Sequence, residues 1–178
     1  MTHPHHLVNI LTGVKGATEM KDATPLARII KKAARPLLVI GPQALEVEID
    51  GKPFIEYLVE IARAGKIPIC ATAHTKKKLL ELGSIPESAY DLMEIINSLK
   101  DPEWKGVKGQ GYHDFVLFGG VRTDLGNQGL STLKHFAPHL KTMTLCKYYY
   151  PNATFSLPNF GKDEEWKAVL EALIAALK

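Results

Sequence analysis

Short apolar runs punctuate the chain, and each is followed by a turn of polar or small residues. The clearest runs cover residues 37–40, 67–71, 114–119 and 141–146, and a weaker one covers residues 153–159. Strands that are buried on both faces of a sheet are typically apolar throughout, as these runs are. We therefore predict four strands and a weaker fifth.

Between these runs, apolar residues recur every three or four positions, which predicts amphipathic helices. The first helix is expected to have Thr24 as its N-cap and Pro25 at its first position, and to end before Pro36. Residues 72–78 read as a polar turn. The predicted helices cover residues 24–33, 53–65, 88–100, 125–137 and 166–177.

Strands that alternate with helices indicate an α/β fold: a three-layer, doubly wound, mostly parallel sheet of five or six strands, Rossmann-like and of the flavin- or NAD-binding type. Residues 1–22 show no strong period and are predicted to be an N-terminal arm. Residues 23–178 are predicted to form a single domain, because no linker or repeat divides them.

Composition narrows the classes of function. The 178 residues are 46% hydrophobic and 23% charged, so the chain has the composition of a folded domain. A net charge of +3 is too small to indicate nucleic-acid binding. No apolar stretch reaches the roughly 18 residues that a membrane span needs, and the N-terminus does not resemble a signal peptide. We therefore expect a soluble cytoplasmic protein with no nucleic-acid or membrane partner.

Metal and catalytic motifs are not evident. Cys70 and Cys146 form no CxxC pair, and two thiolates cannot supply the four ligands that an iron–sulfur cluster normally takes. The histidines at positions 3, 5 and 6 suit either a metal site or a polar arm. The Ser-x-x-Lys pattern at residues 131–134 falls inside a predicted helix. We expect no catalytic residue and no bound metal.

Ligands of doubly wound sheets bind at the carboxyl ends of the strands, where the strand order reverses. The glycines of residues 106–111 precede a predicted strand and so fall on the opposite edge, where they read as a flexible loop. The turns that follow the predicted strands hold the candidate cofactor-binding residues, which are Gly41, Pro42, Gln43, Thr72, His74, Gly119, Gly120 and Arg122.

The first of these turns is a weak nucleotide site. From Gly41 it reads GPQALE, which lacks the second and third glycines of the dinucleotide fingerprint. Pro42 also has no N–H to offer a pyrophosphate. We therefore expect no tightly bound cofactor, and FAD as the candidate for weak binding. Two features have open alternatives: Arg122 with Asp124 is either a ligand clamp or a surface ion pair, and His74 either holds an anion or starts a helix.

Three consecutive tyrosines, Tyr148, Tyr149 and Tyr150, follow the fourth predicted strand. Such a cluster either stacks on a ligand ring or anchors a protein–protein interface, and aromatic residues are enriched at interfaces. We favour the interface.

The order of strands and turns resembles the central domain of thiamine-diphosphate enzymes, as seen in "ARPLLVIG", "IPICATA", "DFVLFGGVRTD" and "HFAPHLKTMTL". That domain is a six-stranded parallel sheet that binds flavin in some members. The thiamine-binding domains have no counterpart in this sequence. The resemblance therefore implies a fold and a nucleotide cleft, without thiamine chemistry.

A closer resemblance covers nearly the whole chain. The segments "RPLLVIGPQAL", "LMEIINSLKDPEWKG" and "LSTLKHFAPHLKTMTLCKYYYPNATFSLPN" are similar to the epsilon subunit of the archaeal acetyl-CoA decarbonylase/synthase complex. The resemblance implies a non-catalytic subunit that stabilises a large alpha subunit, in an alpha-two-epsilon-two carbon monoxide dehydrogenase component, and that assists electron transfer to flavin. It also implies that the nickel–iron–sulfur clusters belong to alpha. The isolated chain is a candidate homo-oligomer, and the alternative function is a free-standing flavin- or NAD-binding enzyme of the same fold.

Overall fold

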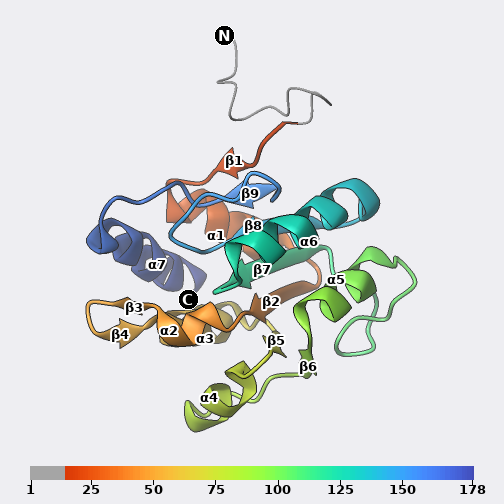
Figure 1. Cartoon of the computed structure of the whole chain (residues 1–178), viewed down its shortest axis with the longest axis horizontal. Helices are drawn as coiled ribbons and strands as arrows, with labels where there is room; N and C mark the ends of the chain where they lie inside the picture. The colour runs from red at the N-terminus through yellow and green to blue at the C-terminus, as the bar shows by residue number, and fades with distance from the viewer. Residues whose placement is uncertain (1–14) are drawn as a thin grey trace.

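The computed structural model describes residues 15–178. Within them, a seven-stranded sheet runs through the centre of the molecule, and every neighbouring pair of strands is parallel (Figure 1). Its order is β1-β9-β8-β7-β2-β5-β6. The strands are β1 (Thr18–Glu19), β2 (Pro36–Ile40), β5 (Ile69–Thr72), β6 (Ser88–Tyr90), β7 (Phe115–Gly119), β8 (Lys141–Thr144) and β9 (Phe155–Ser156). A small antiparallel hairpin joins β3 (Glu48–Ile49) to β4 (Lys52–Pro53).

Helices cover both faces of the sheet, so the three-layer α/β prediction is confirmed. The larger core lies under α1 (Ala23–Lys32), α3 (Phe54–Gly65) and α7 (Asp163–Leu177). The other core lies under α5 (Leu92–Lys100) and α6 (Thr123–Phe136). Two shorter helices, α2 (Gln43–Glu46) and α4 (Thr75–Glu81), begin just after strands β2 and β5.

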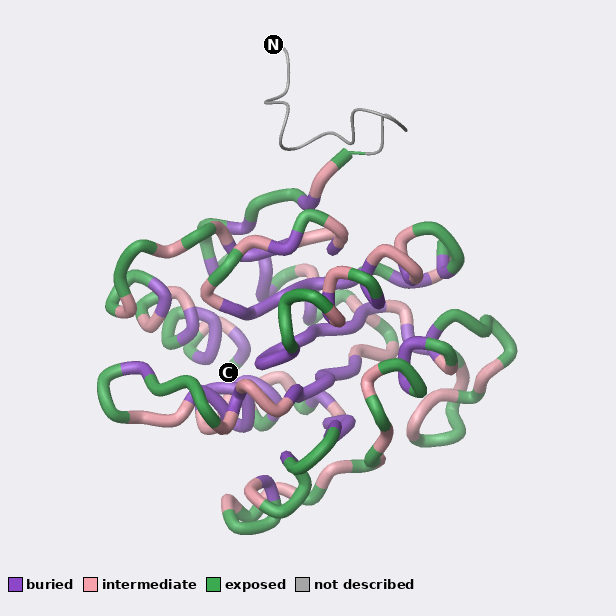
Figure 2. The backbone as a smooth tube through the Cα atoms, in the orientation of Figure 1, coloured by how far each residue is buried: buried purple, intermediate pink, exposed green. Residues whose placement is uncertain are grey.

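Strand β2 shows why the sequence forms a sheet with two covered faces. Successive side chains of a strand point to opposite faces. Leu38 and Ile40 accordingly pack in the core with α1, α3 and α7, whereas Leu37 and Val39 pack in the core with α5 and α6. All four are fully buried, and Figure 2 shows the central strands as the buried interior of the molecule.

The strand order reverses between β2 and β7. From β2 the chain moves outward through β5 to β6, and it then returns to β7 on the other side of β2. Pro36–Ile40 of β2 pairs residue by residue with Phe115–Gly119 of β7. Because both strands end at the same level, the turns after Ile40 and Gly119 meet at the switch point, where such folds bind ligands.

Two edge strands and several boundaries differ from the prediction. Strand β1 lies within the segment predicted to be an arm, where Ala17 is buried and Thr18 pairs with Phe155. Strand β6 occupies residues 88–90, which we predicted to be the start of a helix. Both strands have only two or three residues, too few for a periodic pattern, and pairing with a neighbouring strand fixes them instead.

The helix boundaries are shifted for related reasons. Helix α1 begins at Ala23 with Asp22 as its N-cap, two residues earlier than the predicted Thr24–Pro25 start. Helix α4 covers Thr75–Glu81, where we predicted a polar turn up to residue 78, because buried Thr75 and Leu79 hold this helix against the core. The histidines at positions 3, 5 and 6 lie outside the described residues. None of the helices in residues 15–178 is long and apolar enough to cross a membrane.

Candidate functional site

Two hollows of about 350 Å³ each open at the carboxyl edge of the sheet described above. The first lies over the ends of β2, β5, β6 and β7, and the second lies beside the ends of β7 and β8. The first is lined by Pro42, Thr72, Ala73, Asp91, Leu92, Met93, Arg122 and Leu125. The second is lined by Gln43, Glu46, Val47, Glu48, Phe54, Gly120, Thr123, Cys146, Lys147, Tyr148, Tyr150, Asp163 and Trp166.

The two turns at the switch point pack directly against each other. The N–H of Gly41 donates to the carbonyl oxygen of Gly119 over 2.8 Å, and the N–H of Gln43 donates to the carbonyl oxygen of Gly120 over 2.9 Å. A Cβ on Gly41 would lie 2.4 Å from the Gly120 oxygen, and a Cβ on Gly120 would lie 2.4 Å from the Ala44 nitrogen. Gly120 also has a φ of +67°, a conformation that favours glycine.

This contact gives the glycines a role that differs from phosphate binding. Phosphate sites at such turns rely on backbone N–H groups that point at the ligand. Here the N–H groups of Gly41 and Gln43 already have carbonyl partners, and Pro42 has no N–H. The space beside the turn predicted to hold a pyrophosphate is therefore occupied by the turn that follows β7.

Thr72 and His74 contribute little to the first hollow. The hydroxyl of buried Thr72 lines it but donates to the carbonyl oxygen of Ile40 over 2.9 Å. His74 is exposed at the start of α4 and is not among the residues that line either hollow. Of the two alternatives for His74, the structure shows the start of a helix.

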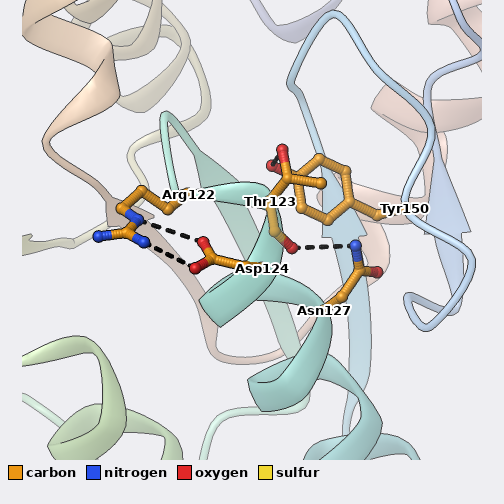
Figure 3. Close-up of polar contacts among 5 residues, drawn as sticks. All are labelled: Arg122, Thr123, Asp124, Asn127 and Tyr150. Carbon is orange, nitrogen blue, oxygen red and sulfur yellow. Dashed lines mark hydrogen bonds and ion pairs between the residues drawn. The ribbon is translucent and has the colours of Figure 1, made fainter.

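Arg122 and Asp124 form a bidentate ion pair at the rim of the first hollow (Figure 3). The guanidinium Nε and Nη2 lie 3.2 Å and 2.7 Å from the two carboxylate oxygens. This contact raises the pKa of Arg122 and lowers the pKa of Asp124. The carboxylate of Asp124 thus occupies the guanidinium fork that a phosphate would need, and Asp91 contributes an acidic side chain to the lining.

The walls of the first hollow are mostly apolar. Their apolar surface comes from Pro42, Leu92, Met93 and Leu125. Two polar residues of the lining already have hydrogen-bond partners, Thr72 with Ile40 and Arg122 with Asp124. Asp91, Leu92 and Met93 were not predicted as lining residues. They follow strand β6, and because the apolar pattern of residues 88–100 predicts a helix, the sequence does not place them at the end of a strand.

The second hollow lies between helix α7 and the turn after β8. The Lys147 ammonium lies 2.8 Å from the Asp163 carboxylate, which raises the pKa of Lys147 through that hydrogen bond. Glu46 and Glu48 add further acidic groups to the lining. Gln43, predicted to belong to a single cofactor site, lines this second hollow and is separated from Arg122 in the first.

The three tyrosines point in different directions, so the predicted aromatic cluster is not formed. Tyr148 is 58% exposed, whereas Tyr150 is 1% exposed and its hydroxyl donates to the carbonyl oxygen of Val121 over 2.9 Å. Tyr149 is half-buried, and its hydroxyl donates to the carbonyl oxygen of Ala17 beside β1. Figure 3 shows Tyr150 behind Thr123, at the base of α6. Of these three tyrosines, only Tyr148 is classed as exposed.

The cysteines are buried and unpaired. Burial raises the pKa of the Cys70 thiol to about 11 and also raises the pKa of Cys146, so both thiols are protonated at neutral pH. Within residues 15–178, no three His, Cys, Asp or Glu side chains are grouped to hold a metal ion. The structure of this part of the chain thus offers no ready set of metal ligands.

The parallel sheet, with its reversal of strand order and its hollows at the switch point, defines a doubly wound α/β protein. Residues 2–174 match the family model for the CO dehydrogenase beta subunit/acetyl-CoA synthase epsilon subunit. The chain belongs to this family.

Relatives from three organisms also match most of the chain. The acetyl-CoA decarbonylase/synthase complex subunit epsilon of Methanothermobacter thermautotrophicus is 43% identical over 93% of this chain and 91% of its own length. The Archaeoglobus fulgidus subunit epsilon 1 is 41% identical over 84% of this chain and 78% of its own length. The Methanothrix soehngenii subunit epsilon is 36% identical, with coverages of 86% and 80%.

Proposed function

We propose that this chain is the epsilon subunit of an acetyl-CoA decarbonylase/synthase complex, and that it is a non-catalytic subunit in the cytoplasm. Its partner is a large alpha subunit that carries nickel–iron–sulfur clusters, in an alpha-two-epsilon-two carbon monoxide dehydrogenase component. The match to relatives named as this subunit, over 93% of the chain for one of them, supports the assignment.

The non-catalytic role is supported by one observation: the polar groups at the switch point are hydrogen-bonded to other groups of the same chain. Arg122 is bound to Asp124, the Thr72 hydroxyl to Ile40, and the Gln43 N–H to Gly120. A catalytic acid, base or nucleophile needs to reach the reacting group. At this edge those groups are engaged with the protein itself, which suits a structural subunit.

We propose further that the isolated chain binds FAD at most weakly, in the first hollow. A flavin supplies electron transfer when it is bound. The apolar walls formed by Pro42, Leu92, Met93 and Leu125 fit a flat ring. The diphosphate of FAD fits poorly, because it meets the closed turn at Gly41 and the carboxylate of Asp124. Closure by the alpha subunit would have to complete such a site.

The test is co-expression of the full chain with the alpha subunit from the same operon or genome, followed by affinity capture through alpha. We expect a stable complex whose mass, from light scattering, corresponds to two copies of each subunit. Carbon monoxide oxidation with an artificial dye should require alpha and should survive heating longer when this chain is present.

The alternative is a free-standing flavin- or NAD-dependent enzyme. It predicts that the chain alone is a homo-oligomer that turns over a substrate and does not bind alpha. Failure of alpha to capture this chain, or carbon monoxide oxidation by the chain free of alpha, would overturn the proposed function.

A further inference from the structure

A basic hollow of about 170 Å³ lies at the amino ends of β2, β5 and β7, across the sheet from the candidate site. Its lining includes the cationic side chains of Arg35, Lys66 and Lys108, together with the amide of Gln110. The glycine-containing loop of residues 106–111 forms one wall. The proposed function does not use this hollow, so its role can be tested separately.

The guanidinium of Arg35 is held rigidly beside the hollow. Its Nε donates to the carbonyl oxygen of Tyr112, and its Cζ lies 4.7 Å from the centroid of the Tyr112 ring. The guanidinium also lies against Gly111: a Cβ placed on this glycine would be only 3.4 Å from the Cζ of Arg35. Within residues 15–178, neither terminal nitrogen of Arg35 has a hydrogen-bond partner. A planar guanidinium held in this way loses little freedom when it binds an oxyanion.

The loop that packs on Arg35 is fixed by a buried histidine. His113 is 5% exposed; its Nε2 accepts the N–H of Val107 at 3.2 Å, and its Nδ1 donates to the carbonyl oxygen of Arg35 at 2.9 Å. The N–H groups of Gly109 and Gly111 bond to carbonyls inside the loop. The loop therefore shapes the hollow, and its side chains and those of its neighbours supply the charge.

The cations outnumber the carboxylates around this hollow. In the described part of the chain, no carboxylate oxygen lies within 4 Å of the charged nitrogens of Arg35 or Lys66. Lys108 does have such a partner, at 3.1 Å from Glu87.

The two nearby carboxylates are already engaged by backbone N–H groups. Glu87 accepts the N–H of Ile69 at 2.8 Å with its second oxygen. Asp114 accepts the N–H groups of Ala34 and Arg35 at 2.7 Å and 2.8 Å. Neither is placed to neutralise the two cations that face the hollow without a partner.

We propose that this hollow binds the phosphate group of a small molecule. Pockets that enclose drug-sized ligands measure about 300–1,000 Å³, so a hollow of about 170 Å³ suits one charged group and leaves the remainder of a larger ligand outside. A phosphate ester carries a charge of roughly −1.5 to −2 at neutral pH, and its oxygens match the fork of a guanidinium. Arg35 provides that fork, Lys66 provides balancing charge, and Lys108, which is paired with Glu87, adds a further cation to the lining.

The experiment is an amide-resolved NMR titration of the full chain with inorganic phosphate, pyrophosphate and ADP, and with malonate as a carboxylate comparison. We expect saturable shifts at Lys66, Gln110 and Gly111 with the phosphate probes and weaker shifts with malonate. Tighter binding of ADP than of pyrophosphate would assign the phosphate to a nucleotide, and the reverse order would assign it to a free anion. Either order supports a phosphate site.

Variants distinguish a built site from general attraction to a basic protein. Arg35→Gln and Lys66→Gln should each weaken pyrophosphate binding about tenfold. Arg28→Gln removes the same charge from the exposed surface of α1 and should leave binding unchanged. Lys66→Gln keeps the test valid if Arg35→Gln disturbs the loop. Absence of shifts at millimolar pyrophosphate, equal binding of malonate, or an equal loss in Arg28→Gln would overturn the proposal.

Discussion

The backbone N–H of Gln43 donates a hydrogen bond to the carbonyl oxygen of Gly120 over 2.9 Å, and this contact closes the switch point of the sheet. The turns after β2 and β7 thereby form one unit that separates the two hollows. The relationship engages the N–H groups of Gly41 and Gln43, which lie at the turn where this kind of fold commonly holds a dinucleotide. It also yields a direct test.

Replacing Gly120 by alanine should destabilise the protein strongly. The substitution adds a Cβ at 2.4 Å from the Ala44 nitrogen and forces alanine to a φ of +67°. We expect the free energy of unfolding to fall by about 3 kcal/mol or more, from strain and overpacking together. Urea denaturation measures this loss.

Gly51→Ala is the matched control. Gly51 has a φ of +74°, but within residues 15–178 no atom beyond its two chain neighbours lies within 4 Å of the position that a Cβ would take, so this variant carries the backbone strain alone. We expect a loss of roughly 1 kcal/mol. Equal losses in the two variants would show that the close approach of the turns adds nothing to stability.

The Arg122–Asp124 pair predicts opposite effects of two substitutions on flavin binding. Asp124→Asn removes the carboxylate that occupies the guanidinium fork, so it should tighten binding of FAD to the isolated chain. Arg122→Gln should abolish what weak binding there is. Quenching of flavin fluorescence checks both. Unchanged binding in both variants would place any flavin away from the first hollow.

Tyr148 and Tyr150 should respond differently to substitution. Tyr148→Ala removes a ring that is 58% exposed, so we expect weaker capture by alpha with an unchanged thermal midpoint. Tyr150→Phe leaves the Val121 carbonyl without its 2.9 Å partner and should cost roughly 1 kcal/mol of stability. Light scattering of the mixed subunits and thermal unfolding of each variant separate the effects. Full-strength capture of Tyr148→Ala would exclude this tyrosine as an interface anchor.

His113 should make stability depend on pH. Burial lowers its pKa from the ordinary value of 6.5, against smaller opposing effects of the Arg35 carbonyl and the Asp114 carboxylate. The unfolded chain therefore takes up a proton as the pH falls below about 6.5, while the folded chain stays neutral at this position. The contribution of His113 to the free energy of unfolding is therefore complete above about pH 6.5. It is lost as the pH falls toward the pKa of His113 in the folded chain, by up to about 1.4 kcal/mol per pH unit.

Urea midpoints between about pH 7.5 and pH 5.5 check this dependence, since that range spans the ordinary histidine pKa. We expect the slope to flatten in His113→Gln and to persist in His135→Gln, because His135 is exposed near the end of α6. An identical slope in the wild type and His113→Gln would assign the pH dependence to other groups.

The sequence by itself determined the α/β class, the five central strands and the edge of the sheet where the candidate residues meet. Each of these depends on local patterns: continuous apolar runs such as residues 37–40, and the direction in which a parallel strand ends. Long segments with similarity to a known family were also enough to indicate that family, because such a likeness resides in the order of the residues alone. Strands β1 and β6 were not predicted, because segments of two or three residues are too short to show a periodic pattern.

Only the tertiary structure decided what the candidate residues do. Gly41 and Gly120 look like parts of a phosphate loop in sequence, but their packing against each other uses the donors that such a loop would offer. Tyr148, Tyr149 and Tyr150 are adjacent in sequence, yet the turn after β8 sends one to solvent and one into the core. Sequence patterns record which side chains a local segment carries, whereas the partners of each N–H, hydroxyl and charge come from segments distant in the chain.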